Sequence, residues 1–156
     1  MIKIAIASDH AGYTAKEAIK DHLNRLKYTI EDFGTTGDKP VDYPDFISPA
    51  AKRVAEGKNQ YGIVFGGSGN GEAMVANKVV GIRCAVCWNK LSARLAKEHN
   101  NANMIAMGAR LISVRQAVGI VNTWLDAVFD GGRHVCRLEK MERLSGNAFN
   151  NCNEYD

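Results

Sequence analysis

The chain has 156 residues, 46% of them hydrophobic, and a formal net charge of +3 at pH 7. This length suits a single domain whose core needs neither disulfides nor a metal. The basic residues are dispersed, apart from a late group at Arg133, Arg137, Lys140 and Arg143, so charge does not indicate nucleic-acid binding. No apolar run approaches the roughly 20 residues of a membrane span, and the N-terminus MIKIAIASDH becomes polar too early for a signal peptide. We therefore expect a cytoplasmic protein that binds neither nucleic acid nor membrane.

Five short apolar or β-branched runs predict strands, at residues 2–7, 28–34, 61–67, 82–88 and 103–109. Helical apolar patterns follow them, at 11–26, 43–57, 71–79, 90–100 and 113–129. In the first helix the apolar stripe runs from Ala15 to Leu26, and His22 lies on it, as expected of a core or boundary residue. Five alternations of strand and helix predict an α/β fold, with a parallel sheet and helices on both faces.

A pair of glycines, residues 131–132, interrupts the helical pattern near the end of the chain. A further helix is predicted at about 133–144, so residues 1–144 form one domain. Residues 145–156 have no apolar period and are predicted to be a flexible tail.

Four cysteines, Cys84, Cys87, Cys136 and Cys152, raise the question of metal or redox chemistry. Cys84 and Cys87 form a C-x-x-C, but they lie in an apolar strand-like run with no second C-x-x-C or histidine pair downstream. This favours buried free thiols over zinc or a redox pair.

Ligands of such folds gather at the carboxyl ends of the parallel strands. There the sequence has SDHAG at 8–12, GGSGNGE at 66–72 and MGAR at 107–110, which carry most of the chemically useful side chains. We therefore expect one shared site formed by these three stretches.

The glycine-rich loop does not have the spacing of a nucleotide-binding loop. Glu72 stands where a Walker loop needs lysine and where a dinucleotide fingerprint needs glycine. The backbone N–H groups of residues 67–71 can instead stabilise a small oxyanion, with Glu72 near enough to remove the proton that creates it. The alternative is that Glu72 is only a favourable acidic residue in the first turn of a helix.

Taken together, five stretches resemble one known family. They are ASDHAGYTAKEAIKDHL (7–23), DYPD (42–45), GIVFGGSGNGEAMVANKVVGIRCA (62–85), AKEHNNANMIAMGAR (96–110) and GGRHVCR (131–137). They resemble type B ribose-5-phosphate isomerase, of the family that includes the galactose-6-phosphate isomerase subunits, from about residue 2 to residue 144. The resemblance implies an aldose–ketose isomerase that needs no metal or other cofactor. It also implies a three-layer α/β/α Rossmann-like sandwich around a five-stranded sheet, in a homodimer or tetramer with sites at the subunit interface.

The resemblance also implies roles for particular residues. Asp9 and His10 would contact the sugar and phosphate, and Tyr43 would line the pocket. The expected anion hole is Gly67, Ser68, Gly69, Asn70 and Gly71, with Ser68 counted among the catalytic residues.

The remaining implied roles fall late in the chain. His99, with Asn100 beside it, resembles the group that opens the sugar ring, and Arg110, Arg133 and Arg137 resemble the phosphate clamp. Arg133 and Arg137 are four residues apart, so they share a helix face and can converge on one dianion, although a solvated basic face has the same spacing. The role of His134 is open.

One departure from the family pattern bears on the base. Many members carry a cysteine base where this chain has Gly66. The GGSGNGE form found here resembles the subtype in which the glutamate, here Glu72, takes the proton, and then none of the four cysteines is catalytic.

We therefore predict interconversion of ribose 5-phosphate and ribulose 5-phosphate through an enediolate. The alternative is the same chemistry on a four- or six-carbon sugar phosphate or on a uronate, because nothing in the sequence fixes the carbon count. A non-catalytic flavodoxin-like binding module is the alternative from another class.

Overall fold

The computed structural model describes residues 1–144 and contains one parallel sheet in that range. Its strands are β1 (Lys3–Ser8), β2 (Thr29–Asp32), β3 (Tyr61–Gly66), β4 (Cys84–Val86) and β5 (Met104–Gly108). They are ordered β2-β1-β3-β5-β4, and every neighbouring pair is parallel. The five predicted strands and their parallel pairing are confirmed.

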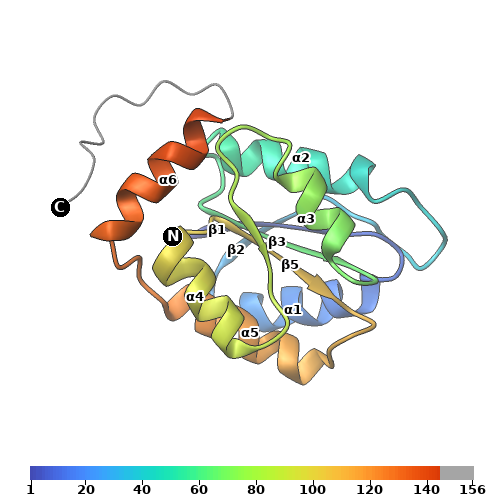
Figure 1. The fold of residues 1–156 in the computed structure, drawn as a ribbon. Coiled ribbons are helices and arrows are strands. Elements are labelled where there is room, and N and C mark those ends of the chain that lie inside the picture. Colours follow the sequence, from blue (N-terminus) through green and yellow to red (C-terminus); the bar gives the residue numbers. More distant parts are fainter. Residues whose placement is uncertain (145–156) are drawn as a thin grey trace.

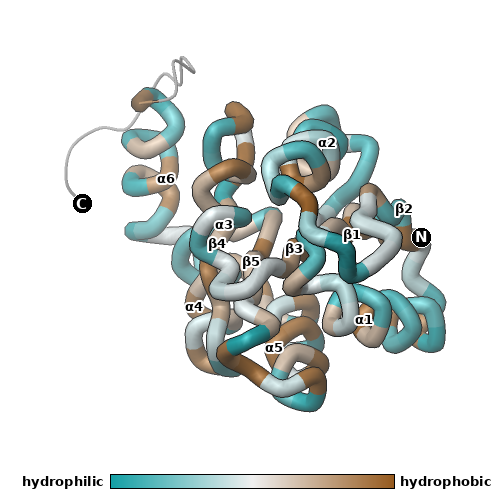
Figure 2. The backbone as a smooth tube through the Cα atoms, turned by 90° about the vertical axis from the view of Figure 1, so that its right-hand side faces the viewer, coloured by the Kyte–Doolittle hydropathy of each residue, from teal (hydrophilic) through white to brown (hydrophobic). Residues whose placement is uncertain are grey.

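Helices cover both faces of the sheet and make three layers (Figure 1). One face carries α1 (Tyr13–Arg25), α4 (Lys90–Asn100) and α5 (Val114–Asp126), and the other carries α2 (Pro44–Ala55) and α3 (Asn70–Ala76). The last helix, α6 (Arg133–Arg143), stands at the edge of the molecule, outside these layers (Figure 2). The predicted α/β/α sandwich is confirmed.

The two faces differ because side chains alternate along each strand. Large residues of β1 and β3 such as Ile4, Ile6 and Phe65 face α1, α4 and α5. Small ones such as Ala5 and Ala7 face α2 and α3. All five side chains are fully buried, so each face of the sheet has a hydrophobic core of its own.

The register brings three strand ends together. Ser8 of β1 lies beside Phe65 of β3, and Gly66 of β3 lies beside Gly108 of β5. The loops that follow β1, β3 and β5 therefore meet at the carboxyl edge of the sheet, as predicted. Because α4 runs back from β4 to the start of β5, it ends at the opposite, amino edge.

Some predicted boundaries shift. α1 ends at Arg25, and Leu26 is about half exposed rather than part of the stripe. His22 lies at a boundary, as expected, with its Nε2 2.8 Å from Asn122 Oδ1. The predicted tail at 145–156 lies outside the described residues. Among helices of residues 1–144, none is long and apolar enough to cross a membrane.

Candidate active site

A pocket of about 540 Å³ opens at the carboxyl edge of the sheet. The loops after β1, β3 and β5 supply most of its lining, with Tyr43 added from the start of α2. The predicted residues that line it are Asp9, His10, Tyr43, Gly67, Ser68, Gly71, Glu72 and Arg110. Residues of the stretches SDHAG, GGSGNGE and MGAR therefore line one pocket, as expected.

Asp9 and His10 are held by hydrogen bonds from backbone N–H groups. Asp9 is buried, and its Oδ1 accepts from the Gly12 N–H at 3.0 Å, which fixes the turn into α1. His10 Nδ1 accepts from the Val41 N–H at 3.3 Å. In a neutral ring the proton is then on Nε2, so His10 can donate a hydrogen bond from that nitrogen.

The glycine-rich loop joins β3 to α3 in a tight turn. Gly69 has a φ of 81°, in the left-handed region, and an added Cβ there would come within 2.9 Å of the Met107 carbonyl carbon. The Asn70 N–H donates to Ser68 Oγ at 3.3 Å. Gly67, Ser68 and Gly71 line the main pocket, whereas Asn70 faces two smaller neighbouring cavities.

Glu72 lies in the first turn of α3 and is buried, with only 4% of its surface exposed. Its carboxylate lies over Gly66, where a Cβ would overlap Cδ and both carboxylate oxygens of Glu72. Burial raises the pKa of the Glu72 carboxyl, and the charge of Asp9 raises it further, while the backbone N–H groups of Glu72 and Gly69 act in the opposite direction. A carboxyl group so placed is a stronger base than an exposed glutamate.

Tyr43 and Arg110 close the sides of the pocket. The Tyr43 ring lies against Gly71, where an added Cβ would come within 2.8 Å of the ring Cζ. Arg110 lies over Gly67, with its Nη1 3.4 Å from the position of a Cβ there. Its side chain is exposed, so its positive charge is available to an anion in the pocket.

The predicted ring-opening and phosphate-binding residues late in the chain, other than Arg110, lie away from this pocket. His99 and Asn100 end α4 at the amino edge of the sheet, and Arg133 and Arg137 lie on α6 beside them. The five residues of β5 separate this edge from the pocket by about 13 Å, at about 3.3 Å per residue. One small molecule therefore cannot contact both Glu72 and His99 of the same chain.

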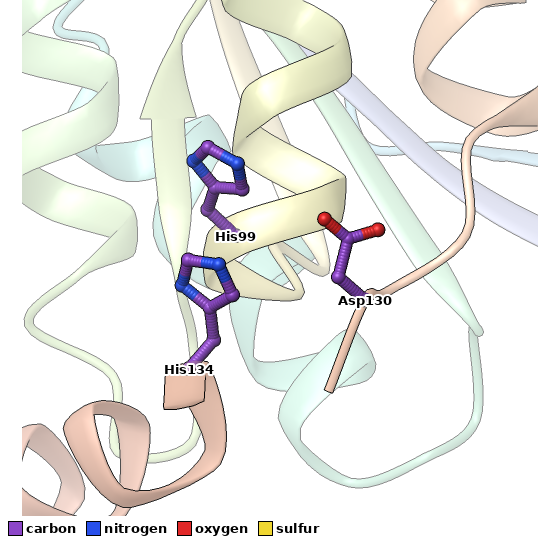
Figure 3. Close-up of side chains that lie close together, drawn as sticks. All are labelled: His99, Asp130 and His134. Carbon is purple, nitrogen blue, oxygen red and sulfur yellow. The ribbon is translucent and has the colours of Figure 1, made fainter. Parts of the chain in front are cut away.

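The predicted site residues at the amino edge of the sheet form a second group of side chains. The His99 ring stacks on that of His134 in α6, with centroids 4.5 Å apart and planes 12° from parallel. Arg133 and Arg137 are exposed, and within residues 1–144 neither forms an ion pair with an acidic side chain. Sequence reasoning left His134 open and missed Asp130, which reaches the two histidine rings from the segment before α6 (Figure 3).

The two cysteines of the C-x-x-C motif are not reactive thiols. Cys84 and Cys87 are buried free thiols, as predicted. Burial raises the pKa of the Cys87 thiol to about 12, and that of the Cys84 thiol is raised also, chiefly by burial. A buried thiol with a raised pKa is a poor nucleophile near neutral pH, so neither cysteine fits the role of a catalytic thiolate.

Fold and pocket together define an α/β protein with a pocket suited to a small molecule at the carboxyl ends of its strands. The sequence profile of a family described as Ribose/Galactose Isomerase matches residues 4–141. Ribose-5-phosphate isomerase B of Escherichia coli is 40% identical over 144 residues, covering 92% of this chain and 97% of that protein. D-erythrulose-4-phosphate isomerase of Pectobacterium atrosepticum is 42% identical over 143 residues, covering 90% and 93%.

A solved structure agrees with these relatives. Ribose-5-phosphate isomerase B of Clostridium thermocellum matches with a TM-score of 0.92 at 47% identity, over 93% of this chain and 98% of that one. The chain belongs to the ribose/galactose isomerase family, and it is an isomerase. The family predicted from the sequence is confirmed.

Proposed function

We propose that this protein interconverts ribose 5-phosphate and ribulose 5-phosphate in the cytoplasm, with Glu72 as the base that removes the C–H proton. The observation that carries the proposal is the position of the Glu72 carboxylate over Gly66, in the pocket that the glycine-rich loop encloses. Glu72 takes the space of a side chain at residue 66, where the family resemblance implies a cysteine base in many members.

The proposed chemistry moves one proton between two carbons. In the open-chain sugar, Glu72 takes the proton from the carbon next to the carbonyl and returns it to the neighbouring carbon. The electron pair of the broken C–H bond passes into an enediolate, whose oxygen the backbone N–H groups of the glycine-rich loop stabilise. The raised pKa of Glu72 supports this role, because a stronger base takes a weakly acidic proton more readily.

A complete site needs a second copy of the chain. Glu72 and His99 lie at opposite edges of the sheet. In a homodimer with a two-fold axis, the amino edge of one copy can cover the pocket of the other, and the same contact is made twice. His99 would then open the sugar ring, with Asn100 beside it, while Arg133 and Arg137 hold the phosphate together with Arg110.

The exposed arginines fit this arrangement. Arg133 and Arg137 are one helical turn apart on α6, and both side chains are exposed. The phosphate of a sugar held in the partner's pocket would pair with both guanidinium groups. Such charge-assisted hydrogen bonds are a strong form of anion binding.

A second candidate is the same reaction on another sugar. The relatives named above act, by their names, on ribose 5-phosphate and on D-erythrulose 4-phosphate, and they are 40% and 42% identical to this chain. Similarity alone therefore does not choose between a five-carbon and a four-carbon substrate.

The test is turnover over a panel of tetrose, pentose and hexose phosphates and a uronate, with unphosphorylated ribose as the control. We expect the highest kcat/KM on ribose 5-phosphate. A higher value on a tetrose or hexose phosphate would transfer the assignment to that sugar, and turnover on none would favour a binding module.

A further inference from the structure

Three side chains with metal-binding chemistry converge where α4, α6 and the segment before α6 meet (Figure 3). His99 comes from the last turn of α4, Asp130 from the segment that follows α5, and His134 from the first turn of α6. One ligand atom from each, a ring nitrogen or a carboxylate oxygen, lies within 4.8 Å of the others. We call these three residues the His99 cluster.

The backbone holds the cluster together. The Asp130 N–H donates to the Glu98 carbonyl at 2.9 Å, which fixes the segment before α6 to the end of α4. Gly131 and Gly132, with φ of 65° and 53°, then turn the chain so that His134 comes back onto His99. His134 is buried and Asp130 is exposed, so the cluster is open to solvent on the carboxylate side.

Two imidazoles and one carboxylate are a donor set suited to Zn²⁺ and similar divalent transition metals. Ligand atoms at about 2.0–2.2 Å from a tetrahedral metal lie about 3.3–3.6 Å apart, so each side chain would have to move inward by less than about 1 Å. The exposed Asp130 and half-buried His99 have room for this rotation.

The surrounding charges act in two directions. Arg133 and Arg137 are exposed on the same helix as His134, and their positive charges repel a cation. Asp130 supplies the one carboxylate among the three residues of the cluster, so it is the decisive ligand.

We propose that the His99 cluster binds a divalent transition metal, and that the bound metal inhibits the enzyme by occupying the imidazole of His99. The metal would be an inhibitor and not a cofactor. Metal binding is independent of the proposed function, whereas the inhibition rests on the role that it gives to His99.

The test is a titration of the chelator-treated full chain with Zn²⁺ in a calorimeter. We expect one ion per chain, and Asp130→Asn should weaken binding at least tenfold; the turnover of each protein without metal is the reference for its inhibition. His134→Gln should weaken binding further, with the fold checked by circular dichroism. Cys136→Ser is the matched control, because this half-buried thiol lies on α6 outside the cluster, and it should bind Zn²⁺ like the unaltered chain.

Zn²⁺ should also inhibit turnover, and Asp130→Asn should shift the inhibiting concentration by the same factor as the affinity. Equal affinities for the unaltered chain, Asp130→Asn and His134→Gln would overturn the metal site, as would the absence of binding. Binding that follows these substitutions without any inhibition would overturn the inhibitory role alone. If the protein has no isomerase activity, the calorimetric result still decides whether the site exists.

Discussion

The carboxylate of Glu72 fills the space that a side chain at residue 66 would need. An added Cβ at Gly66 would overlap Cδ and both carboxylate oxygens of Glu72. A base at residue 66 and the present position of Glu72 therefore exclude each other. If Glu72 is the base, as proposed, it occupies the point of the pocket that a side chain at residue 66 would otherwise reach.

Gly66→Ala tests this relationship. The new methyl group should push the Glu72 side chain away from the pocket, and kcat should fall at least about 100-fold, the scale of a lost general base. Gly37→Ala is the control, because a Cβ there meets nothing within 4 Å. Steady-state kinetics beside a melting curve separates lost activity from lost fold, and a fully active Gly66→Ala enzyme would contradict the placement of Glu72.

Glu72→Gln should stop the reaction while stabilising the fold. The pKa of Glu72 is raised above its ordinary value of 4.5, so the folded state favours the protonated carboxyl. The stability that the protonated group contributes is present below that ordinary value and is lost as pH rises through the raised one. The melting temperature of Glu72→Gln should therefore exceed that of the unaltered protein at pH 7.

The difference should shrink as pH falls toward 4.5, where Glu72 itself becomes protonated. Activity of the unaltered enzyme should fall over the same range, because only the ionised carboxylate accepts a proton. Equal melting temperatures at pH 7, or a gap that widens on acidification, would contradict the burial argument.

Arg137→Ala should weaken the use of phosphorylated substrates. Loss of one charge-assisted contact in a shielded site corresponds to about 2 kcal/mol, or about 30-fold in kcat/KM. Arg115→Ala removes another exposed arginine, from α5, and should change little. If both variants keep the kinetics of the unaltered protein, α6 presents only a solvated basic face.

His99→Asn should separate ring opening from proton transfer. Ribose 5-phosphate is mostly a closed furanose, whereas ribulose 5-phosphate cannot form that ring because its O5 carries the phosphate. The variant should lose most turnover of the aldose, where an acid–base group must move a proton between oxygens. It should keep most exchange of the C1 proton when ribulose 5-phosphate is incubated in deuterated water and followed by NMR. A similar fall in both rates would place His99 in the enediolate step or in binding.

Much of this structure was predictable because each strand is a short apolar run and each helix has a regular stripe. Ile4 and Ile6 alternate with Ala5 and Ala7, which is the pattern of a strand buried on both faces. The strand order was not predictable, because no local sequence pattern indicates that β4 forms the edge of the sheet beside β5. Leu26 was misplaced because the helix ends one residue before it.

The site was predictable where its residues share one loop or one edge of the sheet. The contact of Glu72 with Gly66 depends on how the first turn of α3 folds back on β3, which residue spacing does not reveal. Asp130 was missed because it follows no strand and belongs to no motif. It reaches His99 only through the turn at the two glycines and the hydrogen bond to the Glu98 carbonyl.

The central claim is that one catalytic site takes Glu72 from one chain and His99 from another, and mixing two inactive variants tests it most directly. Glu72→Gln and His99→Asn proteins are combined in equal amounts under conditions of subunit exchange, which mass spectrometry verifies. Ribose 5-phosphate turnover is then measured. Half of the dimers should be mixed, and each mixed dimer has one site with both residues intact, so about a quarter of the unaltered activity should return. No recovery despite verified exchange, or a fully active monomer, would contradict the claim.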